Sequence, residues 1–217
     1  MQKEGFKSLI YGASSGLLMA IPQIWCIFAP IQLIALLPVL YLAAKKEANY
    51  RNLFYAGLSM GIFYLLPQAY VLQFPLSMSL ILSIEWIFIF SAFTILSHRL
   101  FRRQTVFNAF AVGALFVLLD WINFTAVPFW GIAQTVVRPW SAYPKFISFI
   151  CITGLTGIAF LIVTLQSLIV NIIVYPGRKI RFVSTAAILV LVFITANIVL
   201  QSGKAVDRIK VSAIGWP

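Results

Sequence analysis

The chain alternates between long apolar runs and short polar clusters. An apolar run of about 20 residues is long enough to cross a bilayer as a helix. Runs of this kind, the first of them short, cover residues 6–21, 23–44, 53–74, 75–98, 106–127, 146–174 and 181–201. None alternates as barrel strands do, so the pattern predicts an all-α polytopic membrane protein with a bundle of about seven transmembrane helices. The first run ends at Pro22, so it and the second form either two spans or a re-entrant pair.

The composition agrees with this fold class. Hydrophobic residues make up 62% of the chain and charged residues 10%, whereas a soluble domain carries about 25% charged residues. No stretch within residues 1–201 is polar enough to form a soluble domain of its own. We therefore treat these residues as a single transmembrane domain.

Lysine and arginine are distributed unevenly between the two sides of the predicted bundle. With seven spans, eleven basic residues fall on one side and five on the other. The positive-inside rule then predicts a cytoplasmic N-terminus and an external C-terminus. The net charge of +11 is thus a topology signal, and no soluble basic face with base-stacking aromatics indicates a nucleic-acid partner. The eleven residues are Lys3, Lys7, Lys45, Lys46, Arg51, Arg99, Arg102, Arg103, Arg178, Lys179 and Arg181.

Two carboxylates lie inside predicted spans. Glu85 is near the middle of the fourth span and Asp120 is in the outer third of the fifth. A charge at the bilayer centre costs at least about 2.5–3.5 kcal/mol, so such residues usually face the bundle interior. Both residues fit a proton or ion relay, a polar anchor for a substrate head group, or a carboxyl group that ties helices together. No basic residue lies in the membrane to pair with them.

Nucleophiles and metal ligands form no recognisable site. Cys26 and Cys151 both fall in apolar segments without a CxxC spacing or a nearby histidine, so we expect no metal and no cofactor. The GxSxG pattern around Ser14 lies in an apolar helix, outside the strand-turn-helix context that its chemistry needs. We expect His98 to be a solvated residue at a loop edge. The GxxxG patterns that begin at Gly12 and Gly57 predict close helix packing within the bundle.

The longest segment between spans, residues 128–145, is rich in aromatic residues and proline. Its composition suits either an aromatic belt at the membrane interface or a surface that holds a lipid or a lipidated substrate. The second interpretation makes Trp130, Gln134 and Trp140 candidate lipid-binding residues, together with Asp120 and Trp121 on the preceding helix. Three prolines favour a folded loop over a frayed helix end.

The tail at residues 202–217 differs from the rest of the chain. Ile209, Val211 and Ala213 alternate with polar or small residues, as in a β-strand. A lone strand has no partner in an otherwise helical chain. We therefore expect an external linker followed by the first strand of a second domain.

The order of these features resembles the membrane region of the apolipoprotein N-acyltransferase family over nearly the whole chain. The passages that carry the likeness are residues 9–16, 57–64, 119–134, 152–162 and 209–214. The resemblance implies transfer of a fatty acyl group from a phospholipid to the N-terminal amine of a diacylglyceryl-cysteine on a lipoprotein. It also implies a multi-pass location in the bacterial cytoplasmic (inner) membrane, with both lipid substrates entering sideways from the outer leaflet.

Several positions depart from the family pattern. Asp120 replaces the more usual glutamate, Phe129 separates a proline from a tryptophan, Ile132 stands where tyrosine is common, and Gly215 stands where glutamine often follows the first strand. The family's Glu-Lys-Cys triad belongs to a nitrilase-like domain, so no catalytic residue carries over and we expect these 217 residues to be inactive alone. Two other readings stay open: a small transporter or channel subunit that uses Glu85 and Asp120, and a non-catalytic membrane scaffold.

Overall fold

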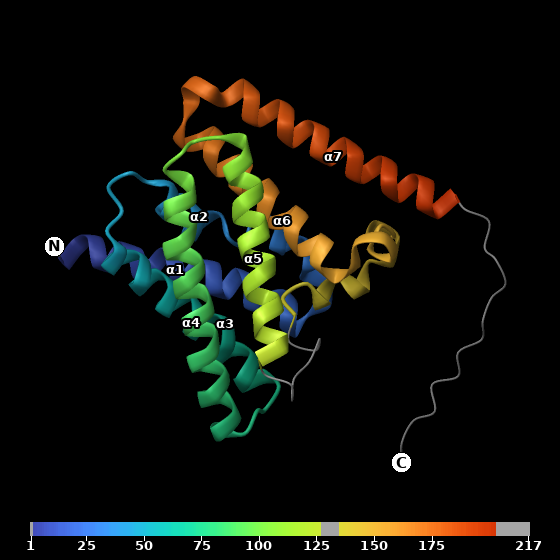
Figure 1. The fold of residues 1–217 in the computed structure, drawn as a ribbon. Helices are drawn as coiled ribbons and strands as arrows, with labels where there is room; N and C mark the ends of the chain where they lie inside the picture. Colours follow the sequence, from blue (N-terminus) through green and yellow to red (C-terminus); the bar gives the residue numbers. More distant parts are fainter. Residues whose placement is uncertain (1, 127–134, 203–217) are drawn as a thin grey trace, which may run out of the picture.

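The structure is a computed structural model that describes residues 2–126 and 135–202, and the described segments are helical without any strand (Figure 1). The all-α prediction is therefore confirmed for this part of the chain. The α-helices are α1 (Gln2–Ile24), α2 (Leu37–Ala44), α3 (Tyr50–Val71), α4 (Leu76–Phe101), α5 (Val106–Ala126), α6 (Ile150–Val174) and α7 (Lys179–Ser202). The short 3-10 segments are η1 (Cys26–Leu33), η3 (Arg138–Ala142), η4 (Pro144–Phe146) and η5 (Pro176–Arg178).

Several helical stretches have the length and composition needed to cross a membrane. Within the described residues there are five: Cys26–Ala44, Leu76–Phe101, Val106–Asn123, Ile150–Val174 and Pro176–Gln201. The chain therefore has the character of a multi-pass membrane protein. Helices α1 and α3 are outside this set, and the count of seven spans stays a prediction. The division of the chain at residue 201 also stays a prediction, since the expected strand at 209–214 lies outside the described residues.

The second predicted span is not one continuous helix. Helix α1 continues through Pro22 to Ile24, the chain then forms the 3-10 segment η1, and α2 begins only at Leu37. Pro30 lies inside η1 and Pro38 lies in the first turn of α2. Proline has no backbone N–H and clashes with the preceding helical turn, so Pro30 favours the irregular backbone of η1, whereas Pro38 is tolerated in the first turn of α2. The predicted span at 23–44 thus corresponds to the helical stretch Cys26–Ala44, whose first part is 3-10 and whose α-helical part begins at Leu37.

Both GxxxG patterns mediate close packing between helices, as predicted from the sequence. A Cβ atom added at Gly12 on α1 would lie 2.0 Å from the carbonyl oxygen of Ala56 on α3. A Cβ atom added at Gly57 on α3 would lie 2.3 Å from the Cα atom of Ser91 on α4. The backbones of α1, α3 and α4 therefore approach so closely that only glycine fits at these positions.

His98 is buried, so the expectation of a solvated loop residue is wrong. Helix α4 continues to Phe101, which places His98 within its last turns, and the imidazole is only 1% exposed. Its Nδ1 atom lies 2.8 Å from the carbonyl oxygen of Ala43, and its ring packs edge-on against Tyr50. The histidine therefore links the end of α2 to α4.

Helices α1 to α6 pack together, and α7 lies on the outside of this bundle. Figure 1 shows α4 and α5 side by side as an antiparallel pair, and α7 returning along the outside of the bundle beside α6. Only 6% of the residues in the apolar stretch of α7 are buried inside the protein. Helix α5 connects the turn after α4 to the segment at 135–146, where the candidate functional residues gather.

Candidate functional site

A buried polar cluster joins four helical elements to the segment that follows α5. We use the name "polar cluster" for Gln23, Gln32, Asp120, Thr135 and Gln166, each at most 3% exposed. These residues come from α1, η1, α5, the start of the 135–146 segment and α6, respectively. Such burial in a predominantly apolar protein requires that their polar atoms find partners inside the fold.

Asp120 takes part in this cluster through one of its two carboxylate oxygens. Its Oδ2 atom accepts a hydrogen bond of 2.9 Å from the hydroxyl of Thr135. Its Oδ1 atom is buried without a hydrogen-bond partner among the residues that the structure describes. The next residue, Trp121, is 50% exposed, because neighbouring positions on a helix point in different directions. The structure therefore separates Asp120, which faces the bundle interior, from Trp121 on its outer surface.

The backbone carbonyl of Val136, next to Thr135, connects two glutamines of the polar cluster. It accepts hydrogen bonds from the side-chain amides of Gln23, at 2.7 Å, and Gln32, at 2.6 Å. The guanidinium of Arg138 donates to the backbone carbonyl of Gln23, at 2.8 Å. The indole N–H of Trp140 donates to the side-chain oxygen of Gln32, also at 2.8 Å. The 135–146 segment therefore packs against η1 and the end of α1, in agreement with the predicted folded loop. The only polar atom of the Trp140 side chain is bonded to the protein.

The side chain of Gln166 hydrogen-bonds the backbone groups that the interruption between η1 and α2 leaves unpaired. Its Oε1 atom accepts a hydrogen bond of 2.6 Å from the backbone N–H of Leu36, and its Nε2 atom donates one of 2.9 Å to the carbonyl of Gln32. The hydroxyl of Ser15 accepts a third bond, of 3.2 Å, from the N–H of Val39. Irregular backbone inside a membrane is tolerated only where the protein satisfies it. These side chains of α1 and α6 supply those partners.

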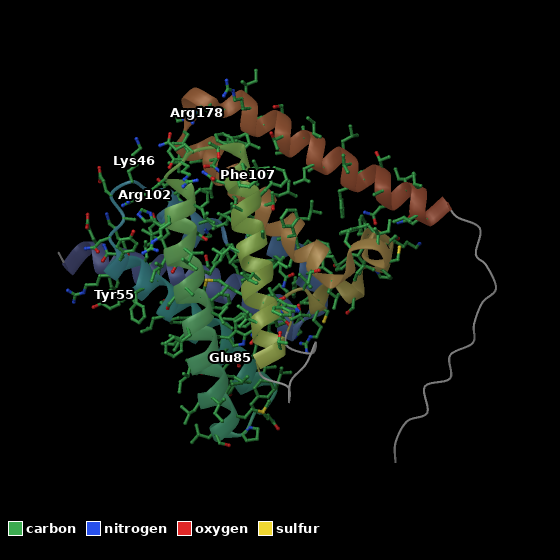
Figure 2. All side chains as sticks on the ribbon, viewed as in Figure 1. Lys46, Tyr55, Glu85, Arg102, Phe107 and Arg178 are labelled. Carbon is green, nitrogen blue, oxygen red and sulfur yellow. The ribbon has the colours of Figure 1, made fainter. Side chains whose placement is uncertain are left out.

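The other predicted site residues are placed as follows. Trp130 and Gln134 lie outside the described residues. Glu85 is half-buried on α4 (Figure 2), and its Oε2 atom has no hydrogen-bond partner in the described part of the chain. No hydrogen bond between Glu85 and Asp120 occurs there. Sequence reasoning missed Gln23, Gln32 and Gln166, although glutamine is unusual in an apolar run and Gln32 lies just after Pro30.

An apolar groove of about 420 Å³ lies between α5 and α6. Trp121 lines it from α5, and Thr153, Thr156 and Phe160 line it from α6. Helix α6 is kinked beside the groove at Gly154, which has a φ of 67°, a conformation that favours glycine. Helix α6 begins at Ile150, four residues later than the predicted span at 146–174, and η4 occupies part of the residues before it.

The nucleophilic side chains show no catalytic arrangement in the described residues. The hydroxyl of Ser14 donates to the carbonyl of Tyr11 in its own helix, at 3.0 Å. Cys26 and Cys151 are free thiols. No group of three or more His, Cys, Asp or Glu side chains is placed to hold a metal ion within residues 2–126 and 135–202.

Comparison with known proteins adds no family assignment. No protein-family model matches the chain, and no curated protein matches it significantly. The resemblance to apolipoprotein N-acyltransferases therefore depends on the sequence passages alone.

We expect Asp120→Asn to be tolerated better than Asp120→Leu. Asparagine keeps an oxygen that accepts the Thr135 hydroxyl, whereas leucine leaves that hydroxyl unpaired, at a cost of about 1–3 kcal/mol. Thermal unfolding of the purified variants in detergent measures the difference. Thr135→Val removes the same bond from the other side, so combining it with Asp120→Leu should cost less than the sum of the two. Equal stability of the Asn and Leu variants would instead indicate that Asp120 is kept for function.

Proposed function

We propose that this chain is the membrane region of a protein similar to apolipoprotein N-acyltransferase, and that the groove between α5 and α6 receives an acyl chain of its lipid substrate. One observation carries the proposal. Trp121 belongs to the family-like passage at 119–134, and Thr153, Thr156 and Phe160 belong to the passage at 152–162. Trp121 and Thr153 are 32 positions apart in the sequence, yet both line the same groove.

The proposal gives the polar cluster a positioning role. By docking the 135–146 segment against η1, the cluster would fix the described part of the chain that follows α5. Trp130 and Gln134, which lie outside the described residues, remain candidate contacts for the lipid. Trp140 would help to hold this segment in place and would not contact the lipid through its indole N–H, which donates to Gln32. Asp120 would position the loop through Thr135.

The orientation inferred from the basic residues is part of the same proposal. With the N-terminus in the cytoplasm and the C-terminus outside, the groove and the polar cluster would face the outer leaflet of the bacterial cytoplasmic membrane. A phospholipid and a diacylglyceryl lipoprotein, the partners implied by the resemblance, would reach them from the side. The described residues would bind and align these lipids, and the acyl transfer itself would need groups that they do not show.

A relay of protons or ions through Glu85 and Asp120 is the alternative function. It is favoured by the buried oxygen atoms of both carboxyl groups that have no partner among the described residues. Proton flux into liposomes that hold the full chain distinguishes the two. Flux that disappears in Asp120→Asn would support the relay, whereas lipid capture without flux would support the acyltransferase-like function.

We expect a photoactivatable phospholipid to label the groove in preference to other lipid-facing surfaces. The full chain is placed in nanodiscs with a phospholipid that carries a diazirine on one acyl chain, and crosslinked peptides are mapped by mass spectrometry. Labelling should be enriched at 114–121 and 153–160. Thr156→Phe fills the groove and should reduce this labelling several-fold, while Ser184→Phe on the exposed face of α7 serves as the matched control. Uniform labelling of all lipid-facing helices would refute the proposal.

A further inference from the structure

A second cavity lies at the other end of α5, where the turn after α4 meets the start of α7. Its volume is about 320 Å³, and it is lined by Gln104, Thr105 and Phe107 on one side and by Arg178, Arg181 and Phe182 on the other. Figure 2 shows Arg102, Phe107 and Arg178 at this end of the molecule. Asp120 of the polar cluster lies near the opposite end of α5.

The two segments that form this cavity carry only positive charge. Residues 99–107 and 175–182 contain six basic residues and no acidic one. Both arginines that line the cavity are exposed. Neither segment therefore supplies a carboxylate to neutralise them. A planar guanidinium pair of this kind favours the bidentate recognition of phosphate oxygens.

One of the two arginines is already held in position. An Nη atom of Arg178 donates a hydrogen bond of 2.7 Å to the backbone carbonyl of Gln104, across the cavity mouth. This bond leaves most of the guanidinium N–H groups free to bind an anion, with less side-chain entropy to lose. Arg181, in the first turn of α7, makes no side-chain hydrogen bond that would compete for the same anion in the described part of the chain.

Aromatic side chains lie beside the two arginines of this cavity, as at a membrane interface. The phenyl ring of Phe107 is 77% exposed, while that of Phe182 is 1% exposed and lies at the cavity floor. The combination of two arginines with an exposed aromatic ring, at the ends of membrane-spanning helices, matches the level of lipid head groups. A free anion would gain nothing from the ring, whereas a phospholipid would place its acyl chains against it.

We propose that this cavity binds the phosphate of an anionic phospholipid, with Arg178 and Arg181 as its ligands and Phe107 against the acyl chains. By the distribution of basic residues, this end of the bundle faces the cytoplasmic leaflet, where anionic lipids attract clustered arginine and lysine. The proposal is independent of the acyltransferase-like function, because the groove between α5 and α6 contributes no residue to it.

The test measures retention of phosphatidylglycerol by the purified full chain, using native mass spectrometry over a lipid titration. Phosphatidylcholine and inorganic phosphate are titrated in parallel. Arg181→Gln should weaken phosphatidylglycerol binding about tenfold, since it removes a charge-assisted contact. Arg103→Gln is the matched control, because it removes the same charge from the same end of the protein without lining the cavity, and it should weaken binding less than about threefold.

Each outcome separates a built site from a diffuse charge effect. Equal weakening by Arg181→Gln and Arg103→Gln would overturn the site. Equal retention of phosphatidylcholine, or phosphate binding that matches that of the lipid, would overturn its assignment to an anionic phospholipid. Arg181→Lys keeps the charge and should retain more lipid than Arg181→Gln, which tests the site even if the glutamine variant is less stable. The thermal midpoint of each variant without lipid reports that stability.

Discussion

Replacing Gln166 with leucine should destabilise the protein more than any other single side-chain change discussed above. The amide of Gln166 is 0% exposed and satisfies both the N–H of Leu36 and the carbonyl of Gln32. Leucine has a similar size but leaves both backbone groups unpaired. Each unsatisfied buried group costs about 1–3 kcal/mol, so the expected loss is about 2–6 kcal/mol. Unfolding of the purified variant in detergent, followed by heat or denaturant, measures it.

Two further variants control this prediction. Gln201→Leu makes the same chemical change at an exposed position on α7. It removes only a hydrogen bond to the carbonyl of Lys145, an exposed group, and should cost less than about 1 kcal/mol. Gln166→Glu keeps the acceptor for the N–H of Leu36. In its ionised form it loses the donor to the carbonyl of Gln32 and buries a charge, so this variant should also be less stable than the wild type. Similar losses in Gln166→Leu and Gln201→Leu would show that the break between η1 and α2 does not depend on Gln166.

Adding a single methyl group at Gly12 should also destabilise the fold strongly. In Gly12→Ala the new Cβ atom would lie 2.0 Å from the carbonyl oxygen of Ala56, so α1 and α3 must move apart. Overpacking of this kind costs about 1–3 kcal/mol. The Ser59 hydroxyl also donates to the carbonyl of Leu9 across this interface, at 2.7 Å, and separation of the helices would stretch that bond. The thermal midpoint in detergent is the readout.

Gly5→Ala on the same helix is the control, with an expected effect of the opposite sign. Nothing lies within 4 Å of a Cβ atom at Gly5. Alanine is favoured over glycine inside a helix by about 0.5–1 kcal/mol, so this variant should be neutral or slightly more stable. If Gly12→Ala proved as stable as Gly5→Ala, the close approach of α1 and α3 would be wrong.

Features that depend on local sequence were predicted well. Long apolar runs indicate membrane helices because the backbone must satisfy its own hydrogen bonds in lipid, and most helix ends fall within a few residues of the run boundaries. The GxxxG patterns indicate close packing because the absence of a side chain is visible in the sequence, as Gly12 and Gly57 show. A count of spans is harder, since α1 and α3 mix apolar with small and polar residues.

The break in the second span and the burial of His98 could not be read from hydrophobic pattern. Residues 26–44 are apolar throughout except for Gln32, so their hydropathy is that of a helix. The irregular backbone is stable only because Gln166 and Ser15, far away in the sequence, reach its free groups. His98 similarly lies beside Arg99 in the sequence, yet its ring packs against α2 and Tyr50.

The sequence by itself thus determined that residues 1–201 form a helical, multi-pass membrane region, which of its glycines allow helices to meet, and at which end of the bundle the basic residues gather. These properties follow from the composition and spacing of neighbouring residues. The tertiary structure decided which polar side chains form a site: Asp120 with Thr135, and Gln23 and Gln32 on Val136. It also brought the turn after α4 against Arg178 to form the second cavity. The physical reason is that a buried polar group is stable only beside its partner, and the partners here come from different helices.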